Sequence, residues 1–204
     1  QKIVIGVILL LAVGANFALQ AAMDDLSSPF GVSLTGATSV AVTQGPITTT
    51  LTFSNADEGW ASINLGAAGV AMPFYGVSYN WLHVCTNGYL VPSTSSAQPA
   101  ADFTPTASEF ASQTPRIALF WCDQILGANT TVVSTIDASP PPGSFANGRI
   151  DFNNIVDYPA PGGTFNYSFF FDVSGAFEII HAGSMTPSAF YDSLVGAGAG
   201  SNLG

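Results

Sequence analysis

Residues 165–182 read FNYSFFFDVSGAFEIIHA, and their two-residue period is typical of β-strands. Aromatic side chains occupy every second position of the first half, so an extended chain would gather them on one face. These residues are Phe165, Tyr167, Phe169 and Phe171. Ser174-Gly175 then offers a turn, and the returning strand would set Phe177, Ile179 and His181 opposite the aromatic face. The stretch predicts a β-hairpin with one face in a hydrophobic core.

The same alternation recurs along the chain. Residues 47–53 would form a strand with one face made of Ile47, Thr49, Leu51 and Phe53, and β-branched threonines suit a half-buried sheet. We expect further strands over residues 32–42, over Thr130–Ile136 and in the glycine-rich tail after residue 192. Residues 92–115 are rich in Ser, Thr, Ala and Pro, which predicts a loop with a short helical turn at residues 108–111.

The composition indicates a mainly β protein with an acidic surface. Charged residues make up 8% of the 204 residues, far below the roughly 25% of an average soluble domain. The formal net charge is −10, and the cationic side chains are Lys2, Arg116 and Arg149. So few cations cannot neutralise a phosphate backbone, which argues against nucleic acid as a partner. The negative charge suits an extracellular surface without naming a ligand.

The first 23 residues, QKIVIGVILLLAVGANFALQAAM, differ from all that follows. As an α-helix, the stretch from Ile3 to Met23 would be about 31 Å long at about 1.5 Å per residue, enough to cross the apolar layer of a bilayer. We therefore expect a hydrophobic helix over residues 1–25 and a β-sandwich over residues 26–204. Lys2 at one end and Asp24-Asp25 at the other would orient a membrane-inserted precursor with the β domain outside.

Such a helix could bundle with copies of itself. Small residues allow close backbone approach, and the polar side chains in the run would need hydrogen-bond partners inside the bundle. The predicted helix-core assembly residues are Ile3, Ile5, Gly6, Ile8, Leu9, Ala12, Val13, Asn16, Phe17 and Gln20.

The N-terminal segment resembles the helix of type IV pilins in position, length and apolarity. It departs from the common bacterial pattern, because Ile5 stands where a glutamate is usual and Gln1 where phenylalanine or methionine is usual. Archaeal-type pilins, which commonly lack that glutamate, remain compatible. The resemblance implies a filament built on bundled helices. A second interpretation stays open, in which residues 1–22 act as a secretory signal peptide or a membrane anchor.

A second resemblance covers roughly residues 50–200. Its motifs are Pro73-Phe74-Tyr75-Gly76, Asn87-Gly88-Tyr89-Leu90, Arg116-Ile117-Ala118 followed by Trp121 and Asp123, and Gly148-Arg149-Ile150-Asp151-Phe152. Their order resembles the nidogen-like β domain of extracellular and bacterial surface proteins. The resemblance implies a β fold at the cell surface and leaves the function open.

The residues of these motifs carry further expectations. Asn87-Gly88 would form a type I′ turn or a left-handed bend, and Trp81, Phe120 and Trp121 would fill a core between two sheets. The motif strands also contain Cys85 and Cys122, which the resemblance would place close together. A disulfide between them is favoured in an exported protein, and two separate buried thiols are the alternative.

Few residues suggest a catalytic or metal-binding role. His83 and His181 have no neighbouring acid or serine motif, so we expect structural histidines, no enzyme activity and no cofactor. Calcium could be held by Asp57-Glu58 or by Asp123, although an oxygen-only site needs about six or more ligands and solvated turn acids are the simpler interpretation. Two glycosylation sequons begin at Asn129 and Asn166.

Together these observations predict a structural subunit of an extracellular, pilus-like filament. Its helices would bundle in the core after passing through the cytoplasmic membrane, its β domains would lie on the surface, and its partner would be itself. The alternative is a secreted or membrane-anchored adhesion module on the cell surface, with residues 1–22 as signal peptide or anchor.

Overall fold

The structure is a computed structural model that describes residues 45–140, 147–158, 163–183 and 193–200. The chain divides into two units, Gln1–Thr43 and Gln44–Gly204. The predicted helix of residues 1–25, its ten assembly residues and the strands expected over residues 32–42 lie outside the described residues. Within the described ranges, no helix has the length and apolarity needed to cross a membrane.

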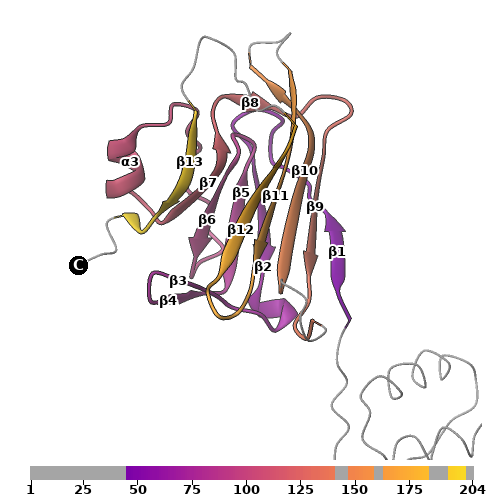
Figure 1. The fold of residues 1–204 in the computed structure, drawn as a ribbon, viewed down its shortest axis with the longest axis vertical. Coiled ribbons are helices and arrows are strands. Elements are labelled where there is room, and N and C mark those ends of the chain that lie inside the picture. The colour runs from indigo at the N-terminus through magenta and orange to yellow at the C-terminus, as the bar shows by residue number, and fades with distance from the viewer. Residues whose placement is uncertain (1–44, 141–146, 159–162, 184–192, 201–204) are drawn as a thin grey trace, which may run out of the picture. The chain divides into compact units, whose positions relative to one another are not determined.

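The second unit is mainly β, as predicted, and its larger sheet is antiparallel. The order is β1 (Ile47–Thr50), β9 (Thr131–Ile136), β10 (Gly148–Asp157), β11 (Thr164–Phe171) and β12 (Phe177–Ala182). The short β8 (Gln124–Ile125) pairs with the last residues of β10. Figure 1 shows β1 at one edge of this sheet. The predicted strand over residues 130–136 is confirmed, whereas the one over residues 47–53 ends at Thr50.

A second antiparallel sheet has the order β13 (Leu194–Gly198), β7 (Arg116–Trp121), β6 (Tyr89–Ser93), β5 (Trp81–Cys85) and β2 (Trp60–Asn64). β3 (Met72–Phe74) and β4 (Val77–Tyr79) form a separate hairpin. The 3₁₀ turn η1 (Gly66–Ala68) follows β2, and the helix α3 (Ala107–Ser112) contacts β13 (Figure 1). The predicted helical turn and the predicted strand in the tail are therefore confirmed.

One hydrophobic cluster joins the two large sheets. It includes Leu82, Leu90 and Leu119 of the second sheet together with Ile150 and Phe152 of the first. The aromatic face predicted for residues 165–171 lies in the same cluster, and all four of its aromatic side chains are buried. The hairpin register is also as predicted, because Phe171 pairs with Phe177, Phe169 with Ile179 and Tyr167 with His181.

A smaller cluster lies on the other face of the second sheet. Its buried members are Trp60, Cys85, Tyr89, Val91, Ala118 and Trp121, and Phe110 of α3 packs on them. The expectation that Phe120 and Trp121 share one core is wrong, because these two side chains lie on opposite faces of the second sheet. Phe120 enters the cluster between the sheets, and Trp121 enters the smaller one. Trp81 is half-buried and stacks on His83.

The buried Arg116 binds the segment after β6 and packs on the aromatic rings of this smaller cluster. Its guanidinium carbon lies 4.6 Å from the ring centre of Tyr89 and 4.3 Å from that of Trp121. Its Nη1 lies 3.6 Å from Asp102 Oδ2, and its Nη2 donates to Gln113 Oε1 at 2.9 Å. A planar cation can lie over aromatic rings in this way while it pairs with a carboxylate at its edge.

Two turns depend on a left-handed backbone. In the β3–β4 hairpin both Tyr75 (φ 45°) and Gly76 (φ 78°) have positive φ. In the β5–β6 turn only Gly88 does (φ 76°), so Asn87-Gly88 is the left-handed bend and not the type I′ turn. A β-carbon on Gly88 would lie 2.3 Å from the Phe120 carbonyl oxygen, so the position has no room for a side chain.

The larger sheet has two different ends. Ile47 pairs with Ile136, Ile136 with Gly148, Gly148 with Phe171 and Phe171 with Phe177, so this row marks one end, which we call the entry end. β10 runs from it over about 30 Å, at about 3.4 Å per residue, to Asp157, which pairs with Gln124. We call that far end, with Asp57, Glu58 and Asp123 beside it, the acidic end.

Candidate functional site

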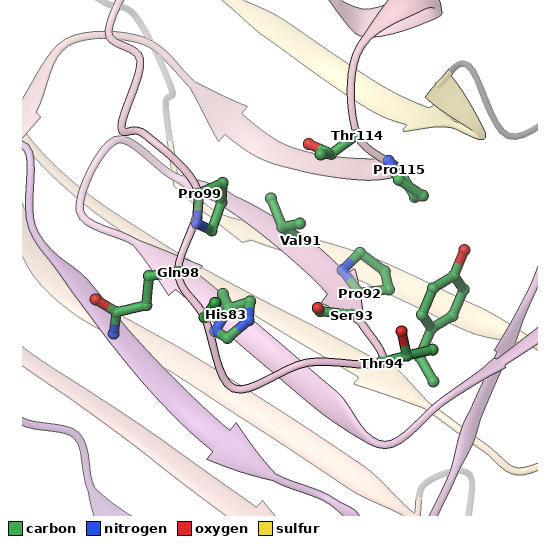
Figure 2. A pocket seen from close by; sticks show the side chains of 11 residues that line it. His83, Val91, Pro92, Ser93, Thr94, Gln98, Pro99, Thr114 and Pro115 are labelled. Carbon is green, nitrogen blue, oxygen red and sulfur yellow. The ribbon is translucent and has the colours of Figure 1, made fainter.

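A cavity of about 350 Å³ lies on the face of the second sheet that carries the smaller cluster. Figure 2 shows Thr114 and Pro115 across it from His83 and Gln98. Polar side chains and prolines line it together, and its full lining is Tyr79, His83, Val91, Pro92, Ser93, Thr94, Ala97, Gln98, Pro99, Thr114 and Pro115. Its volume falls at the lower end of the roughly 300–1,000 Å³ range of small-molecule sites.

His83 is fully buried beside this cavity, and both its ring nitrogens are hydrogen-bonded. Nδ1 lies 2.9 Å from Ser62 Oγ, and Nε2 lies 3.0 Å from the Ser95 carbonyl oxygen. Because a carbonyl oxygen can only accept, Nε2 carries a proton, and in the neutral imidazole Nδ1 then accepts from the Ser62 hydroxyl. Burial lowers the pKa of His83, which favours the neutral imidazole that this pattern requires.

The Ser62–His83 pair is a contact that sequence reasoning did not anticipate. A hydroxyl that donates to a neutral imidazole is the arrangement that activates a nucleophilic serine. In a hydrolytic triad, however, the second ring nitrogen donates to a carboxylate that stabilises the imidazolium. Here it donates to the Ser95 carbonyl, and Gln98 Nε2 donates to Ser62 Oγ at 2.9 Å. These bonds hold the segment after β6 against β2 and β5.

Three carboxylates meet at the acidic end. Asp57 and Glu58 belong to the tight turn that leads into β2, and Asp123 lies two residues after the end of β7. Each offers a ligand atom, and these atoms lie within 4.8 Å of one another. Glu58 has a positive φ of 52°. The turn is closed by bonds from Ser54 N to the Trp60 carbonyl and from Gly59 N to Thr86 Oγ1.

Asn87 connects this cluster to the rest of the site. Its Nδ2 donates to Glu58 Oε1 at 3.3 Å and to the Asp102 carbonyl at 3.1 Å. Its Oδ1 accepts from the backbone N–H of Gln124 at 3.1 Å, and its carbonyl accepts from that of Cys122. One buried amide therefore fixes the Glu58 turn, the segment after β6 and the end of β7 together.

Burial and nearby charges raise the pKa values of two acids of the cluster, Asp123 and Glu58. Burial is the main cause that raises the pKa of Asp123 to about 6, and the charges of Asp57, Glu58 and Asp157 raise it further. Burial also raises the pKa of Glu58, against the lowering effect of the hydrogen bond from Asn87. The cluster therefore resists carrying all its negative charges at once.

The structure brings together the acids at which the sequence suggests calcium, Asp57-Glu58 and Asp123. It does so because the β2 turn and the end of β7 meet around the β5–β6 turn. Asn87 was singled out only as a turn residue, although an amide beside glycine in a turn can also bind side chains of neighbouring loops. Asp157 carried no sequence signal, because its place depends on the pairing of β10 with β8.

Cys85 and Cys122 are both buried free thiols. Cys85 belongs to the smaller cluster and Cys122 to the one between the sheets, so their side chains occupy different faces. Burial raises the pKa of Cys85 to about 11 and that of Cys122 to about 12. The favoured disulfide is not formed in this structure, which has the two separate thiols of the alternative.

The remaining predicted residues lie apart from these sites. His181 Nε2 donates to the Leu119 carbonyl at 2.7 Å and so links β12 to β7. Asn129 is exposed in a turn, and Asn166 lies in β11 with its Oδ1 accepting from the Asn154 backbone N–H at 2.9 Å. Glycosylation at either asparagine stays a prediction. No family model, curated protein or solved structure matches this chain.

Proposed function

We propose that the chain is a structural subunit of an extracellular, pilus-like filament. In this proposal residues 1–25 form the hydrophobic helix that bundles with other copies, after a stage in the cytoplasmic membrane. The β domain is a nidogen-like β-sandwich on the filament surface, without enzyme activity or a cofactor. The protein binds itself and does not bind nucleic acid.

The observation that carries this proposal is a set of exposed apolar side chains at the entry end. Ile47 of β1 and Phe177 of β12 both lie in the row that defines this end, at opposite edges of the sheet. The β3–β4 hairpin adds exposed Tyr75 and Val77, because Phe74 contacts both Phe177 and Tyr75. We call Ile47, Tyr75, Val77, Val173 and Phe177 the entry patch.

The position of the entry patch supports assembly through the N-terminal segment. The chain enters β1 from residue 46, so the polypeptide before it joins the domain at this same end. A filament subunit needs its domain to pack against helices and neighbouring domains close to where its own helix begins. Exposed aromatic and aliphatic side chains at that point are the kind of surface that such contacts bury.

A matched pair of substitutions tests the proposal. Val173 is 55% exposed in the entry patch, and Val195 of β13 is 51% exposed. Val195 lies towards the acidic end, because its neighbour Leu194 pairs with Trp121. We expect full-length Val173→Asp to reduce filament yield strongly in negative-stain electron microscopy, and Val195→Asp to assemble like the wild type. Deleting residues 1–23 should leave a soluble monomer. Filaments from the deleted chain would show that the helix-core proposal is wrong.

The cavity beside His83 favours the alternative, a surface adhesion module. Its mixture of polar side chains and prolines suits a small polar ligand, and Phe103 in the nearby segment is exposed. Phe110, the other aromatic residue of residues 94–115, packs on the smaller cluster instead. Calorimetric titration of a sugar panel into the wild type and into Thr94→Arg, which would fill the cavity, tests this alternative. Binding that the substitution abolishes would support it.

A further inference from the structure

We propose that Asp57, Glu58 and Asp123 form a calcium site at the acidic end of the β domain. The inference goes beyond the proposed filament function and does not depend on it.

The spacing of the carboxylates fits a shared ion. Calcium bonds to oxygen at about 2.3–2.6 Å, so two of its ligands lie at most about 5 Å apart. The ligand atoms of Asp57, Glu58 and Asp123 lie within 4.8 Å of one another. They come from two segments that are 65 residues apart in the chain, Glu58 being the nearer of the first pair to Asp123. Three carboxylates could supply three to six oxygens, and water would complete a shell of about six to eight.

One of the carboxylates, that of Asp123, is buried, and a second carboxylate has a buried oxygen without a hydrogen bond. Asp123 is only 5% exposed, and its carboxylate lies beside those of Asp57 and Glu58. Asp57 Oδ1 is buried and has no hydrogen-bond partner among the described residues. A buried carboxylate without hydrogen bonds is costly unless a cation compensates it. Both side chains belong to the cluster, so one cation there would compensate the two carboxylates together.

The protein's own cations do not fill this role within the described residues. Arg116 pairs with Asp102 and stacks on Tyr89 and Trp121, while Arg149 pairs with Asp151 in β10. The acids that face the cluster from neighbouring elements are Asp157 at the end of β10 and Asp102 after β6, and their charges act on Asp123 and Glu58. The local field is therefore strongly negative.

The three carboxylate ligands favour some metal ions over others. Carboxylate oxygens are hard donors that suit calcium and magnesium, whereas zinc and copper favour imidazole and thiolate ligands. Magnesium demands nearly octahedral geometry and keeps several waters, whereas calcium accepts irregular shells of protein oxygens. A site assembled from a turn and a strand end, with one ligand held by Asn87, fits calcium better.

Calorimetric titration of the chelator-treated full chain with calcium chloride tests the proposal. We expect one ion to bind per chain and the melting temperature to rise when calcium is added. Asp57→Asn and Asp123→Asn should each weaken calcium binding at least tenfold. Glu178→Gln, which removes one exposed charge on β12, serves as the control and should bind calcium like the wild type.

The metal-free melting temperature distinguishes a lost site from a damaged fold. Removing one of three repelling acids should raise the melting temperature of the metal-free chain while it abolishes the rise on adding calcium. The proposal is overturned if calcium produces neither heat nor a shift in the wild type. It is also overturned if Glu178→Gln loses as much affinity as Asp123→Asn, or if magnesium binds as tightly as calcium.

Discussion

The side-chain amide of Asn87 donates to Glu58 Oε1 at 3.3 Å and to the Asp102 carbonyl at 3.1 Å. Because Asn87 is a neutral hydrogen-bond donor among acids, its donated bonds, and not only its shape, hold the Glu58 turn, the segment after β6 and the end of β7 together. Replacing it by an isosteric acid changes the chemistry alone.

Asn87→Asp should therefore destabilise the fold by about 2–4 kcal/mol, because two donated bonds are lost and a like charge is added beside Glu58. Urea denaturation measures the change. Asn55→Asp is the control, since it adds the same charge to the same turn and keeps the oxygen that accepts from Asp57 N. Equal losses in the two variants would show that general repulsion, and not the Asn87 bonds, sets the stability.

Gly88 and Gly76 give a second matched pair, because their φ angles are 76° and 78°. Alanine in the left-handed region costs roughly 1–2 kcal/mol, and Gly76→Ala should lose about that much because its surroundings are open. Gly88→Ala should lose about 3 kcal/mol or more, because its β-carbon would clash with the Phe120 carbonyl. Thermal and urea unfolding compare the two. Similar losses would mean that the β5–β6 turn can move away from β7.

The buried neutral His83 predicts a pH dependence. Its pKa is lowered in the folded state, so the unfolded chain takes up a proton first as the pH falls below about 6.5. The stability that His83 contributes is therefore present above that pH and is lost as the medium becomes more acidic. The difference in unfolding free energy between wild type and His83→Gln should shrink from pH 7.5 to pH 5. A difference that stays constant would contradict a buried neutral imidazole.

The two thiols can be counted directly. Because Cys85 and Cys122 are buried and their pKa values are raised to about 11 and about 12, neither should react with Ellman's reagent in the native protein at pH 8. In denaturant without reductant, both should react. A count of zero there would establish the disulfide that the nidogen-like resemblance favoured.

The strands were predictable from sequence where their signal is local. The aromatic alternation of residues 165–171 states which side chains share a face, and the hairpin register follows from the turn at Ser174-Gly175. The assignment of Trp121 failed for a non-local reason, since its face is covered by the segment after β6 and by Arg116. A strand buried on both faces shows no alternation that could reveal this cover.

The sequence indicated individual residues of the candidate sites but not which of them lie together. Asp57, Glu58 and Asp123 could be singled out as acids near turns, but their meeting depends on how β2, β5 and β7 pair. Ser62 and His83 face each other because β2 and β5 pair in that register. Such cross-strand neighbours become visible only once the sheet is assembled.

The first strand has a mechanical consequence. A pull along the backbone from residue 45 enters the β domain at β1, because β1 is the first strand that the structure describes. β1 is four residues long, lies at a sheet edge, pairs with β9 and has no buried residue. Under load it can detach while Phe152, Phe169 and Leu119 still hold the two sheets together. Its release would add about 3.4 Å of extended chain per residue. The added length would reduce the force that reaches the core.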